Sequence, residues 1–265
     1  MVLTNENYFS PEVQMEYMGV SQYKDFLDCP ARALATVKGE YKPEMTKALL
    51  VGSYVDAYFE GTLDKFKAEH PEIFNSRTGE LKVDYQQAND IIKRIESDEL
   101  FMEHMSGQKQ VILTAELFGT PWKIKIDSYH PGKQIDDLKV MRSLERIMGI
   151  SFVQHWGYDT QMAVYSEVEA IATGGERLET YLDVATKEDP ADLAIVHIPA
   201  WRRKECLAEV EKNMPRILAY KRGELEAPGC GVCPYCRGKK KAKVIEFDEV
   251  GFSNKELAAM NGKAF

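Results

Sequence analysis

The chain has 265 residues, of which 44% are hydrophobic and 29% charged, and its formal net charge is −8. This composition is typical of a globular protein with one large or two small domains, and it excludes fibrous and disordered chains. No apolar run approaches the ~18 residues of a membrane span, and the polar, acid-containing first residues do not resemble a secretory signal. We therefore expect a cytoplasmic protein without a membrane partner. The negative charge weakens a nucleic-acid interpretation without excluding it, because a local groove can still be basic.

Residues 1–108 are predicted to be mainly helical, after a loose lead-in over the first ten. Serine, proline and glycine mark the expected helix ends, because they favour caps, first turns and stops respectively. The expected helices run from Ser21 to Asp28, from Pro30 to about Lys38, from Thr46 to Glu60, from Asp64 to His70 and from Asp84 to Met105.

Residues 109–200 carry the predicted sheet. Residues 111–118 are rich in β-forming side chains, residues 122–129 alternate strictly between polar and apolar, and residues 134–140 form a third strand. Turn signals at Gly119-Thr120-Pro121 and Pro131-Gly132 separate these strands, which predicts an antiparallel three-stranded meander. A helix over 158–172, strands over 181–186 and 193–198, and a long helix over 201–223 follow. We expect a single α/β domain over 1–265, in which 201–265 holds the long helix and a cysteine-bearing tail.

Two acids in this meander are predicted to meet. If the turn over 131–133 has three residues, Asp127 lies directly opposite Asp137, with Cβ atoms ~5 Å apart. Carboxylates at that distance repel each other unless a cation lies between them, and divalent ions prefer oxygen ligands. Lys139 faces the same side one pleat further along. This pattern indicates metal-dependent phosphodiester hydrolysis; a solvated surface hairpin is the alternative interpretation.

Glu116 is a further candidate ligand on the preceding strand. It faces the same side as Asp127 if Gly119-Thr120 forms a two-residue turn. A solvated strand acid is the alternative for this residue.

The sequence from Asp127 to Asp137-Leu138-Lys139 resembles the PD-(D/E)XK nuclease superfamily, in its RecB/RecE-like, phage-type exonuclease branch (exodeoxyribonuclease VIII-like). Residues 52–56 stand where that branch has a Gly-x-x-x-His motif, residues 161–165 match its Gln-x-x-x-Tyr motif, and residues 19–30 resemble the start of its phage-type members. The resemblance implies a restriction-endonuclease-like core with a mixed sheet flanked by helices. It also implies a DNA exonuclease that uses Mg²⁺ or Mn²⁺ and resects linear double-stranded DNA in phage or prophage recombination, with a single-strand annealing protein as partner.

The same resemblance implies roles for individual residues. Asp127 and Asp137 would hold the metal, and Lys139 would position water or stabilise developing charge. Gln161 and Tyr165, which share a helix face, would contact DNA or orient Lys139. Asp56 is a candidate metal ligand where the branch usually has histidine. A non-catalytic DNA-binding or scaffold module, and an endonuclease of the same superfamily, are the alternative functions, and a homo-oligomer is compatible with either.

Three cysteines lie within seven residues, as Cys230-x₂-Cys233-x₂-Cys236. Thiolates at that spacing can wrap one compact metal centre. Together with the Cys29-Pro30 pair near the N-terminus, they resemble the iron–sulfur centre of some RecB-like nucleases, which implies Cys29 as the fourth ligand. We expect a [4Fe–4S] cluster at these cysteines, and zinc is the alternative metal. The iron–sulfur cluster is preferred because zinc sites more often use two separated Cys-x₂-Cys pairs.

Overall fold

The computed structural model describes residues 2–242, 244, 246 and 247. The chain divides into two compact units, Met1–Gly229 and Cys230–Phe265. The single nuclease-like domain over 1–265 stays a prediction, and part of its 201–265 segment lies outside the described residues. Within the described part of the chain, no helix is both long and apolar enough to cross a membrane.

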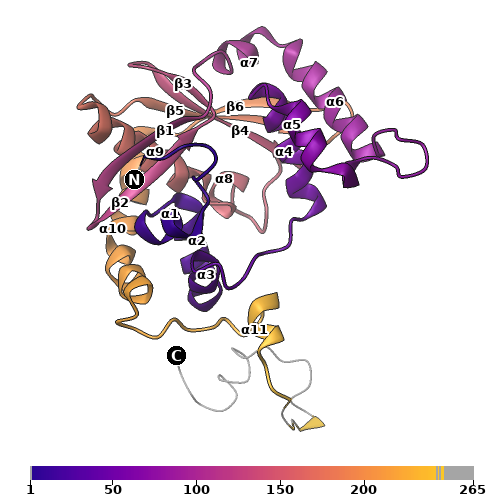
Figure 1. The fold of residues 1–265 in the computed structure, drawn as a ribbon. Coiled ribbons are helices and arrows are strands. Elements are labelled where there is room, and N and C mark those ends of the chain that lie inside the picture. Colours follow the sequence, from indigo (N-terminus) through magenta and orange to yellow (C-terminus); the bar gives the residue numbers. More distant parts are fainter. Residues whose placement is uncertain (1, 243, 245, 248–265) are drawn as a thin grey trace. The chain divides into compact units, whose positions relative to one another are not determined.

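The first unit begins with helices, as predicted (Figure 1). They are α1 (Pro11–Glu16), α2 (Val20–Asp28), α3 (Pro30–Val37), α4 (Lys47–Phe59), α5 (Leu63–Glu69), the 3₁₀ turn η1 (Pro71–Ile73), α6 (Val83–Glu96) and α7 (Glu99–His104).

Two of these helices differ from the prediction, and side-chain caps explain both differences. The Ser10 hydroxyl accepts a hydrogen bond from the Val13 N–H at 3.4 Å and starts α1 directly after the lead-in. The helix predicted over 84–105 is two helices, because the Asp98 carboxylate accepts a hydrogen bond from the Phe101 N–H at 3.0 Å and begins a new one.

The predicted meander is present, with a break in its middle strand. Its strands are β1 (Val111–Leu117), β2 (Thr120–Ile126), β3 (Ser128–His130) and β4 (Gln134–Met141), and both β1–β2 and β3–β4 are antiparallel. The break lies at Asp127, where the backbone bends between β2 and β3. Ser128 pairs with Asp136 across the three-residue turn, which confirms the predicted register and makes Asp127 and Asp137 the next opposed positions.

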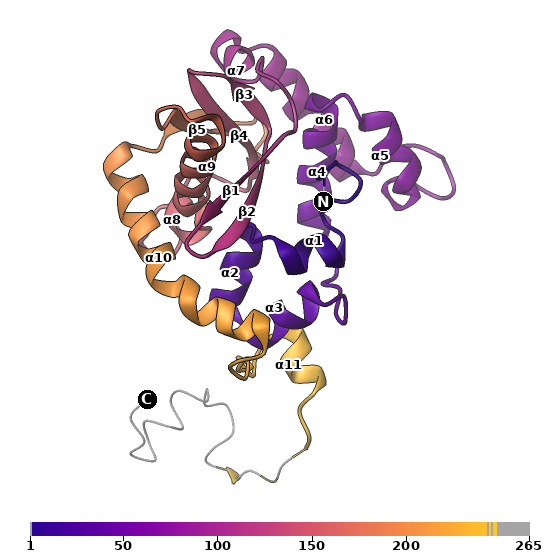
Figure 2. The same cartoon turned by 60° about the vertical axis from the view of Figure 1, so that its left-hand side comes forward.

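The larger sheet is mixed and has helices on both sides (Figure 2). Its strand order is β3-β4-β5-β6, with β5 (Glu179–Thr186) parallel to β4 and β6 (Leu193–His197) antiparallel to β5. The helices α8 (Phe152–His155), α9 (Tyr158–Thr173) and α10 (Ala200–Arg222) lie on one side, and α4 and α6 lie on the other. This arrangement confirms the expected α/β fold class.

The side chains of neighbouring residues in β4 point to opposite faces of the sheet. Leu138 lies in an apolar cluster with Val55 of α4 and Ile92 of α6. Asp137 instead accepts a hydrogen bond from Gln161 of α9. Because side chains alternate along a strand, the odd-numbered and even-numbered residues of β4 belong to different environments.

The end of α10 holds the N-terminal helix in place. The buried Lys221 ammonium donates hydrogen bonds to the carbonyl oxygens of Gln14 and Tyr17 at 3.0 and 3.1 Å and to the Gln22 side chain at 3.1 Å. Burial lowers the pKa of Lys221 to about 8. Since α1 has six residues, it is too short to be stable alone, and its position depends on this lysine.

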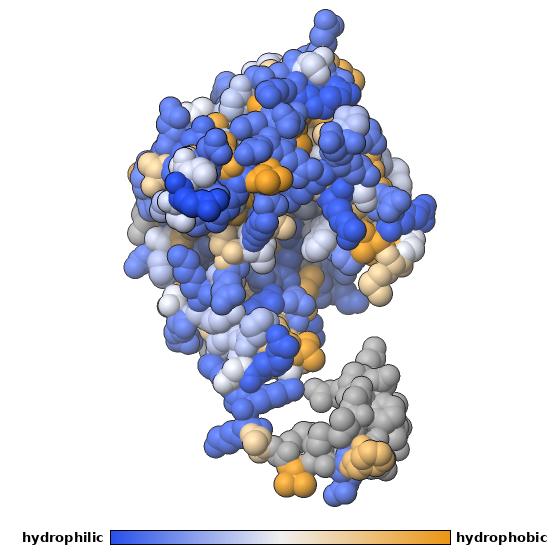
Figure 3. Space-filling model, turned by 90° about the vertical axis from the view of Figure 1, so that its right-hand side faces the viewer, coloured by the Kyte–Doolittle hydropathy of each residue, from blue (hydrophilic) through white to orange (hydrophobic). Residues whose placement is uncertain are grey.

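The surface shown in Figure 3 is mainly hydrophilic, and hydrophobic residues appear there singly or in small groups. Scattered apolar residues of this kind are normal on a folded domain. The polar character of this side agrees with the 29% of charged residues in the sequence.

We expect Gly107→Ala to lower the free energy of unfolding by about 1–3 kcal/mol, the usual cost of overpacking. A Cβ atom on Gly107 would lie 2.7 Å from both the Ser128 hydroxyl and the Tyr129 carbonyl oxygen, which belong to β3. Gly52→Ala in α4 is the control: nothing lies within 4 Å of its Cβ position, and alanine should stabilise the helix by up to about 1 kcal/mol. Urea unfolding followed by circular dichroism measures both, and equal midpoints for the two variants would contradict the packing.

Candidate active site

One cavity of about 760 Å³ in the first unit contains almost all residues of the predicted acidic site. Six of the seven line it: Asp56 from α4, Asp127, Asp137 and Lys139 from the β2–β4 segment, and Gln161 and Tyr165 from α9. Segments far apart in sequence thus contribute to one site. The exception is Glu116.

Asp127 occupies the bend between β2 and β3, and its carboxylate is tied to the opposite strand. Its Oδ2 accepts a hydrogen bond from the Leu138 N–H at 3.1 Å, and its Oδ1 accepts one from the Gln110 side chain at 3.2 Å. Burial, followed by the neighbouring carboxylate of Asp137, raises the pKa of Asp127 to about 7. The carboxylate is therefore fixed in direction, and the positive charge of Lys139 offsets its burial only in part.

Asp137 is held by two side chains. Gln161 Nε2 donates a hydrogen bond to Asp137 Oδ1 at 2.7 Å, and the Lys139 ammonium forms an ion pair with Oδ2. Burial alone would lower the pKa of Lys139, but Asp137 and Asp127 outweigh it and raise that pKa. Lys139 is therefore a charged donor in this site and not a base. Gln161 orients Asp137, the partner of Lys139.

The cavity is also lined by two acids, one in α4 and one at its C-terminal cap. Burial and then the charge of Asp127 raise the pKa of Asp56 well above its ordinary value. Glu60, which no sequence motif indicates, lines the same cavity and contributes to the raised pKa of both aspartates. Its spacing of four residues from Asp56 places both on one helix face, and this spacing is the signal that could have found it.

Tyr165 and a row of lysines complete the lining. Burial, followed by the charge of Asp137, raises the pKa of Tyr165 well above its ordinary value, so its hydroxyl stays a donor. The cavity is also lined by Lys65, Lys109, Lys123 and Lys125. Lys123 and Lys125 share the face of Asp127, as the alternation predicts.

The lead-in over the first ten residues is more ordered than predicted. Tyr8 is buried and lines the cavity, and the Lys123 ammonium lies 4.2 Å from the centre of its ring. Lys123 also donates a hydrogen bond to the Tyr8 carbonyl oxygen. This lysine is thus held at the edge of the site by the N-terminal segment.

Glu116 is exposed and is not part of the cavity lining. The β1–β2 turn consists of Phe118 and Gly119, both with positive φ, because Leu117 pairs with Thr120. The turn therefore lies one residue earlier than Gly119-Thr120. Glu116 pairs with Pro121 at the far end of the hairpin, so the structure does not bring it to the other acids.

Comparison with known proteins agrees with this geometry. A family model described as "PDDEXK-like domain of unknown function (DUF3799)" matches residues 19–239. The chain belongs to this family. The expected PD-(D/E)XK resemblance is thereby confirmed, and the DUF3799 match includes every residue of the cavity named above except Tyr8.

Solved structures extend the comparison. A protein of Eubacterium rectale described as a "putative exonuclease" is 47% identical, with a TM-score of 0.90, and the match covers 98% of this chain and 99% of that one. The structure of SSO0001 is 12% identical over 85% of this chain and 96% of that one, with a TM-score of 0.33, too low to indicate a shared fold. The comparison with curated proteins found no match.

The fold of this family implies a divalent metal ion, and the donor set in the cavity fits one. Asp56, Asp127 and Asp137 supply hard oxygen ligands, and the raised pKa values of Asp56 and Asp127 reflect a repulsion that a cation would relieve. Asp137 Oδ2 is buried and, apart from its ion pair with Lys139, has no partner among the described residues.

The predicted cysteine ligands belong to both units. Cys29 is buried between α2 and α3 in the first unit. In the second unit, the Cys233 N–H donates to the Cys230 sulfur at 3.3 Å, and the Cys236 N–H donates to the Cys233 sulfur at 3.4 Å, at the start of α11 (Pro234–Gly238). Backbone N–H groups thus donate to two of the three sulfur atoms in this segment.

We expect Mg²⁺ to raise the melting temperature of the wild-type protein by about 5 °C at a concentration of 100 times its Kd, because a ligand of the folded state stabilises it by mass action. Asp127→Asn should abolish this increase. In EDTA the same variant should melt no earlier than the wild type, because it removes carboxylate repulsion. Differential scanning fluorimetry with and without Mg²⁺ measures these shifts.

Glu116→Gln is the matched control for this measurement, since it removes an acid from the same hairpin outside the cavity. It should keep the whole Mg²⁺ response. An equal response in Asp127→Asn and Glu116→Gln would contradict a metal site at Asp127.

Proposed function

We propose that the protein is a Mg²⁺-dependent DNA exonuclease that degrades linear double-stranded DNA from its ends. The observation that carries this proposal is the presence of Asp127, Asp137 and Lys139 in one cavity with Gln161 and Tyr165. Membership of a PDDEXK-like family and the likeness to the Eubacterium rectale structure support nuclease activity. The preference for DNA ends, a role in phage or prophage recombination and an annealing protein as partner rest on the sequence resemblance.

Asp127 and Asp137 would hold Mg²⁺ or Mn²⁺, with Asp56 as a third oxygen ligand. When bound, such an ion supplies Lewis acidity and an activated water for phosphodiester hydrolysis. The Leu138 N–H and the Gln161 amide fix the directions of the Asp127 and Asp137 carboxylates at 3.1 and 2.7 Å. Ligand orientation of this kind is what a metal site requires of its surroundings.

Lys139 would act on the substrate as a fixed positive charge. Since neighbouring carboxylates raise its pKa, it stays protonated and can donate hydrogen bonds to the attacking water or to a phosphate oxygen. A preorganised donor of this kind is worth about 10²–10³ in rate. The Tyr165 hydroxyl, whose pKa is also raised, is a second donor toward the same space.

The lysines of the cavity would receive the DNA backbone. Lys65 and Lys125 line it beside the acids, whereas the ammonium of Lys123 donates to the Tyr8 carbonyl oxygen and that of Lys109 to the Met105 carbonyl oxygen. Phosphate contacts of lysine supply much of the affinity of proteins for DNA. Lys65 and Lys125 would give a chain with a net charge of −8 local contacts for a polyanion, beside acids whose charge a bound metal ion would offset.

We expect Lys139→Ala to lower the rate of DNA cleavage at least about 100-fold while DNA binding persists. Lys133→Ala is the matched control, because Lys133 lies on the same hairpin with an exposed side chain paired to Glu103. End-labelled linear duplex and closed circular DNA are each incubated with Mg²⁺ and with EDTA. Loss of the linear DNA alone, only with Mg²⁺, is the expected result.

Each other outcome of this assay has a defined meaning. Cleavage of the circle indicates an endonuclease of the same superfamily. Binding without cleavage of either substrate indicates the DNA-binding or scaffold alternative. Full activity of Lys139→Ala would overturn the assigned site.

We further propose that Cys29, Cys230, Cys233 and Cys236 bind a [4Fe–4S] cluster, with zinc as the alternative metal. Within the first unit, the Ala31 N–H donates a hydrogen bond to the Pro228 carbonyl oxygen at 3.1 Å. Ala31 lies two residues after Cys29, and Pro228 lies two residues before Cys230. This contact supports Cys29 as the fourth ligand, because it brings the chain that leads to the cysteine cluster to the start of α3.

Anaerobically purified protein should contain about four iron and four sulfide ions per chain. Cys233→Ser should lose them, whereas Cys206→Ser, which changes a buried cysteine of α10, should keep them. Iron and acid-labile sulfide analysis measures the content. Zinc in place of iron would contradict the iron–sulfur cluster, and neither metal in the wild type would contradict the whole assignment.

A further inference from the structure

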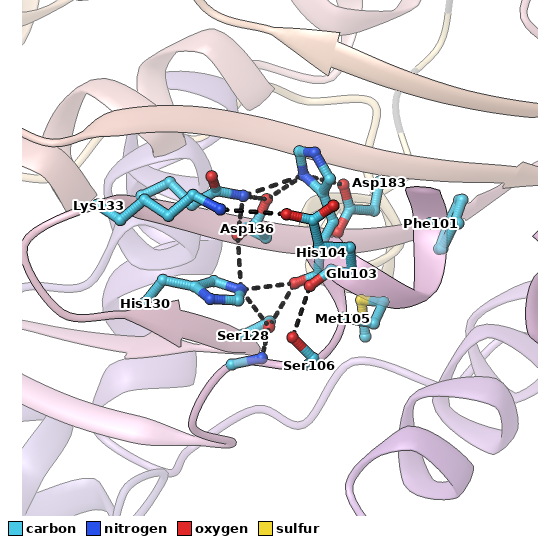
Figure 4. A network of polar contacts seen from close by, with 12 residues as sticks. Phe101, Glu103, His104, Met105, Ser106, Ser128, His130, Lys133, Asp136 and Asp183 are labelled. Atoms are coloured by element: carbon cyan, nitrogen blue, oxygen red, sulfur yellow. Dashed lines mark hydrogen bonds and ion pairs between the residues drawn. The ribbon is translucent and has the colours of Figure 1, made fainter. Parts of the chain in front are cut away.

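A second polar cluster lies on the other face of β4 from Asp137 and Lys139. It joins His104 at the end of α7, Asp136 of β4 and Asp183 of β5, and Figure 4 shows these side chains directed toward one another. One ligand atom of each lies within 4.8 Å of those of the other two. Because Asp136 and Asp137 are consecutive in a strand, they point to opposite sides, so this cluster is separate from the cavity of the acidic site.

The donor atoms of the cluster are close enough together to surround one small ion. His104 Nδ1 lies 2.6 Å from Asp136 Oδ1 and 3.5 Å from Asp183 Oδ1. Zinc bonds of about 2 Å in tetrahedral geometry separate neighbouring donor atoms by roughly 3.3 Å. The 3.5 Å contact is close to that separation, whereas the 2.6 Å contact is a direct hydrogen bond, which a bound ion would replace by moving the two atoms apart. Gln134 Nε2 also lies 3.2 Å from His104 Nδ1 and would have to turn from it when the nitrogen binds an ion.

Within the described part of the chain, the Asp183 carboxylate is buried without the hydrogen bonds that would compensate its burial. Its side chain is fully buried, and neither of its carboxylate oxygens has a hydrogen-bond partner among the described residues. Burying an ionised carboxylate without partners costs several kcal/mol. Burial, followed by the charge of Asp136, raises its pKa well above the ordinary value. His130 Nε2 also lies 3.5 Å from Asp136 Oδ2, and the charge of Lys109 lowers the pKa of Asp183 in part. With both imidazoles neutral, two buried acids beside one lysine leave negative charge that a cation would neutralise.

The residues around the cluster orient its ligands. Gln134 Nε2 donates to both oxygens of Asp136 at 3.0 Å. His130 Nε2 lies 2.9 Å from the His104 carbonyl oxygen, which also accepts a hydrogen bond from the Ser128 hydroxyl at 2.7 Å. Such outer contacts fix ligand directions in metal sites and are a usual part of them. They also attach the end of α7 to β3.

We propose that His104, Asp136 and Asp183 bind a divalent transition-metal ion of the zinc class, at a site separate from the acidic cavity and from the cysteines. An imidazole ligand favours zinc or a related ion over magnesium or calcium, which prefer ligand sets made of oxygen alone. The ion joins α7 to β4 and β5 and so acts on stability. Its ligand set leaves a fourth position for water.

The test measures zinc in protein that has been stripped with a chelator, reconstituted with Zn²⁺ and freed of excess metal. Asp183→Asn and His104→Gln should each contain one zinc ion per chain less than the wild type, by plasma mass spectrometry. Glu103→Gln is the matched control, an exposed acid next to His104 on α7. Metal at the cysteines is common to all four proteins, so the difference reports this site alone.

Thermal unfolding supplies a second readout. Zn²⁺ should raise the melting temperature of the wild type and of Glu103→Gln, and it should raise that of Asp183→Asn less. Equal zinc content in Asp183→Asn and the wild type would overturn the proposal. Equal zinc content together with a higher melting temperature of Asp183→Asn than of the wild type in EDTA would indicate a network in which the two acids share a proton. That result would also overturn the metal site.

Diffraction from wild-type crystals tests the site without any variant. Data collected on either side of the zinc absorption edge should show an anomalous peak between the three side chains. Zinc-loaded crystals without such a peak would overturn the proposal even if the variants fail to fold.

Discussion

The pairing of β3 with β4 is the constraint on which the rest of the site depends. The three-residue turn over 131–133 sets a register in which Ser128 lies opposite Asp136, so Asp127 and Asp137 are the next opposed positions. The Asp127 carboxylate then receives the Leu138 N–H at 3.1 Å. A shift of one residue would send every side chain of β4 to the other side of the sheet, which would remove Asp137 from the cavity.

The parts of the molecule that the sequence predicts are those set by local periodicity. Strict alternation and two turn signals predict the meander, the register of β3 with β4 and the common face of Lys125 and Asp127. The turn between β1 and β2 lies one residue earlier than predicted. Helical spacing predicts that Gln161 and Tyr165 share a face of α9. The family resemblance adds Asp56, whose place in the cavity no local pattern reveals. The predictions from periodicity are correct because residues close together in the sequence determine these elements.

The parts that the sequence does not predict depend on contacts between distant segments. The bend at Asp127 between β2 and β3 cannot be predicted from the alternation of polar and apolar residues, because this alternation continues through residues 122–129. His104 and Asp183 are 79 positions apart in the sequence. Nothing in the sequence around either residue distinguishes it from an ordinary hydrogen-bonded polar side chain. Tyr8 belongs to a segment with weak local preference, and its burial depends on Lys123 of β2. No periodicity in a single segment contains such information.

The lysine of α10 that holds α1 has a consequence for how the chain is made. Lys221 contacts Gln14 and Tyr17 across more than 200 positions. The hydrogen bond from the Ala31 N–H to the Pro228 carbonyl oxygen likewise cannot form until residue 228 has been synthesised. A ribosome releases the N-terminal helices long before these partners emerge, at a rate of about 5–20 residues per second. The start of the chain therefore remains without its final partners for roughly 10–40 s, an interval in which its apolar side chains are accessible to chaperones.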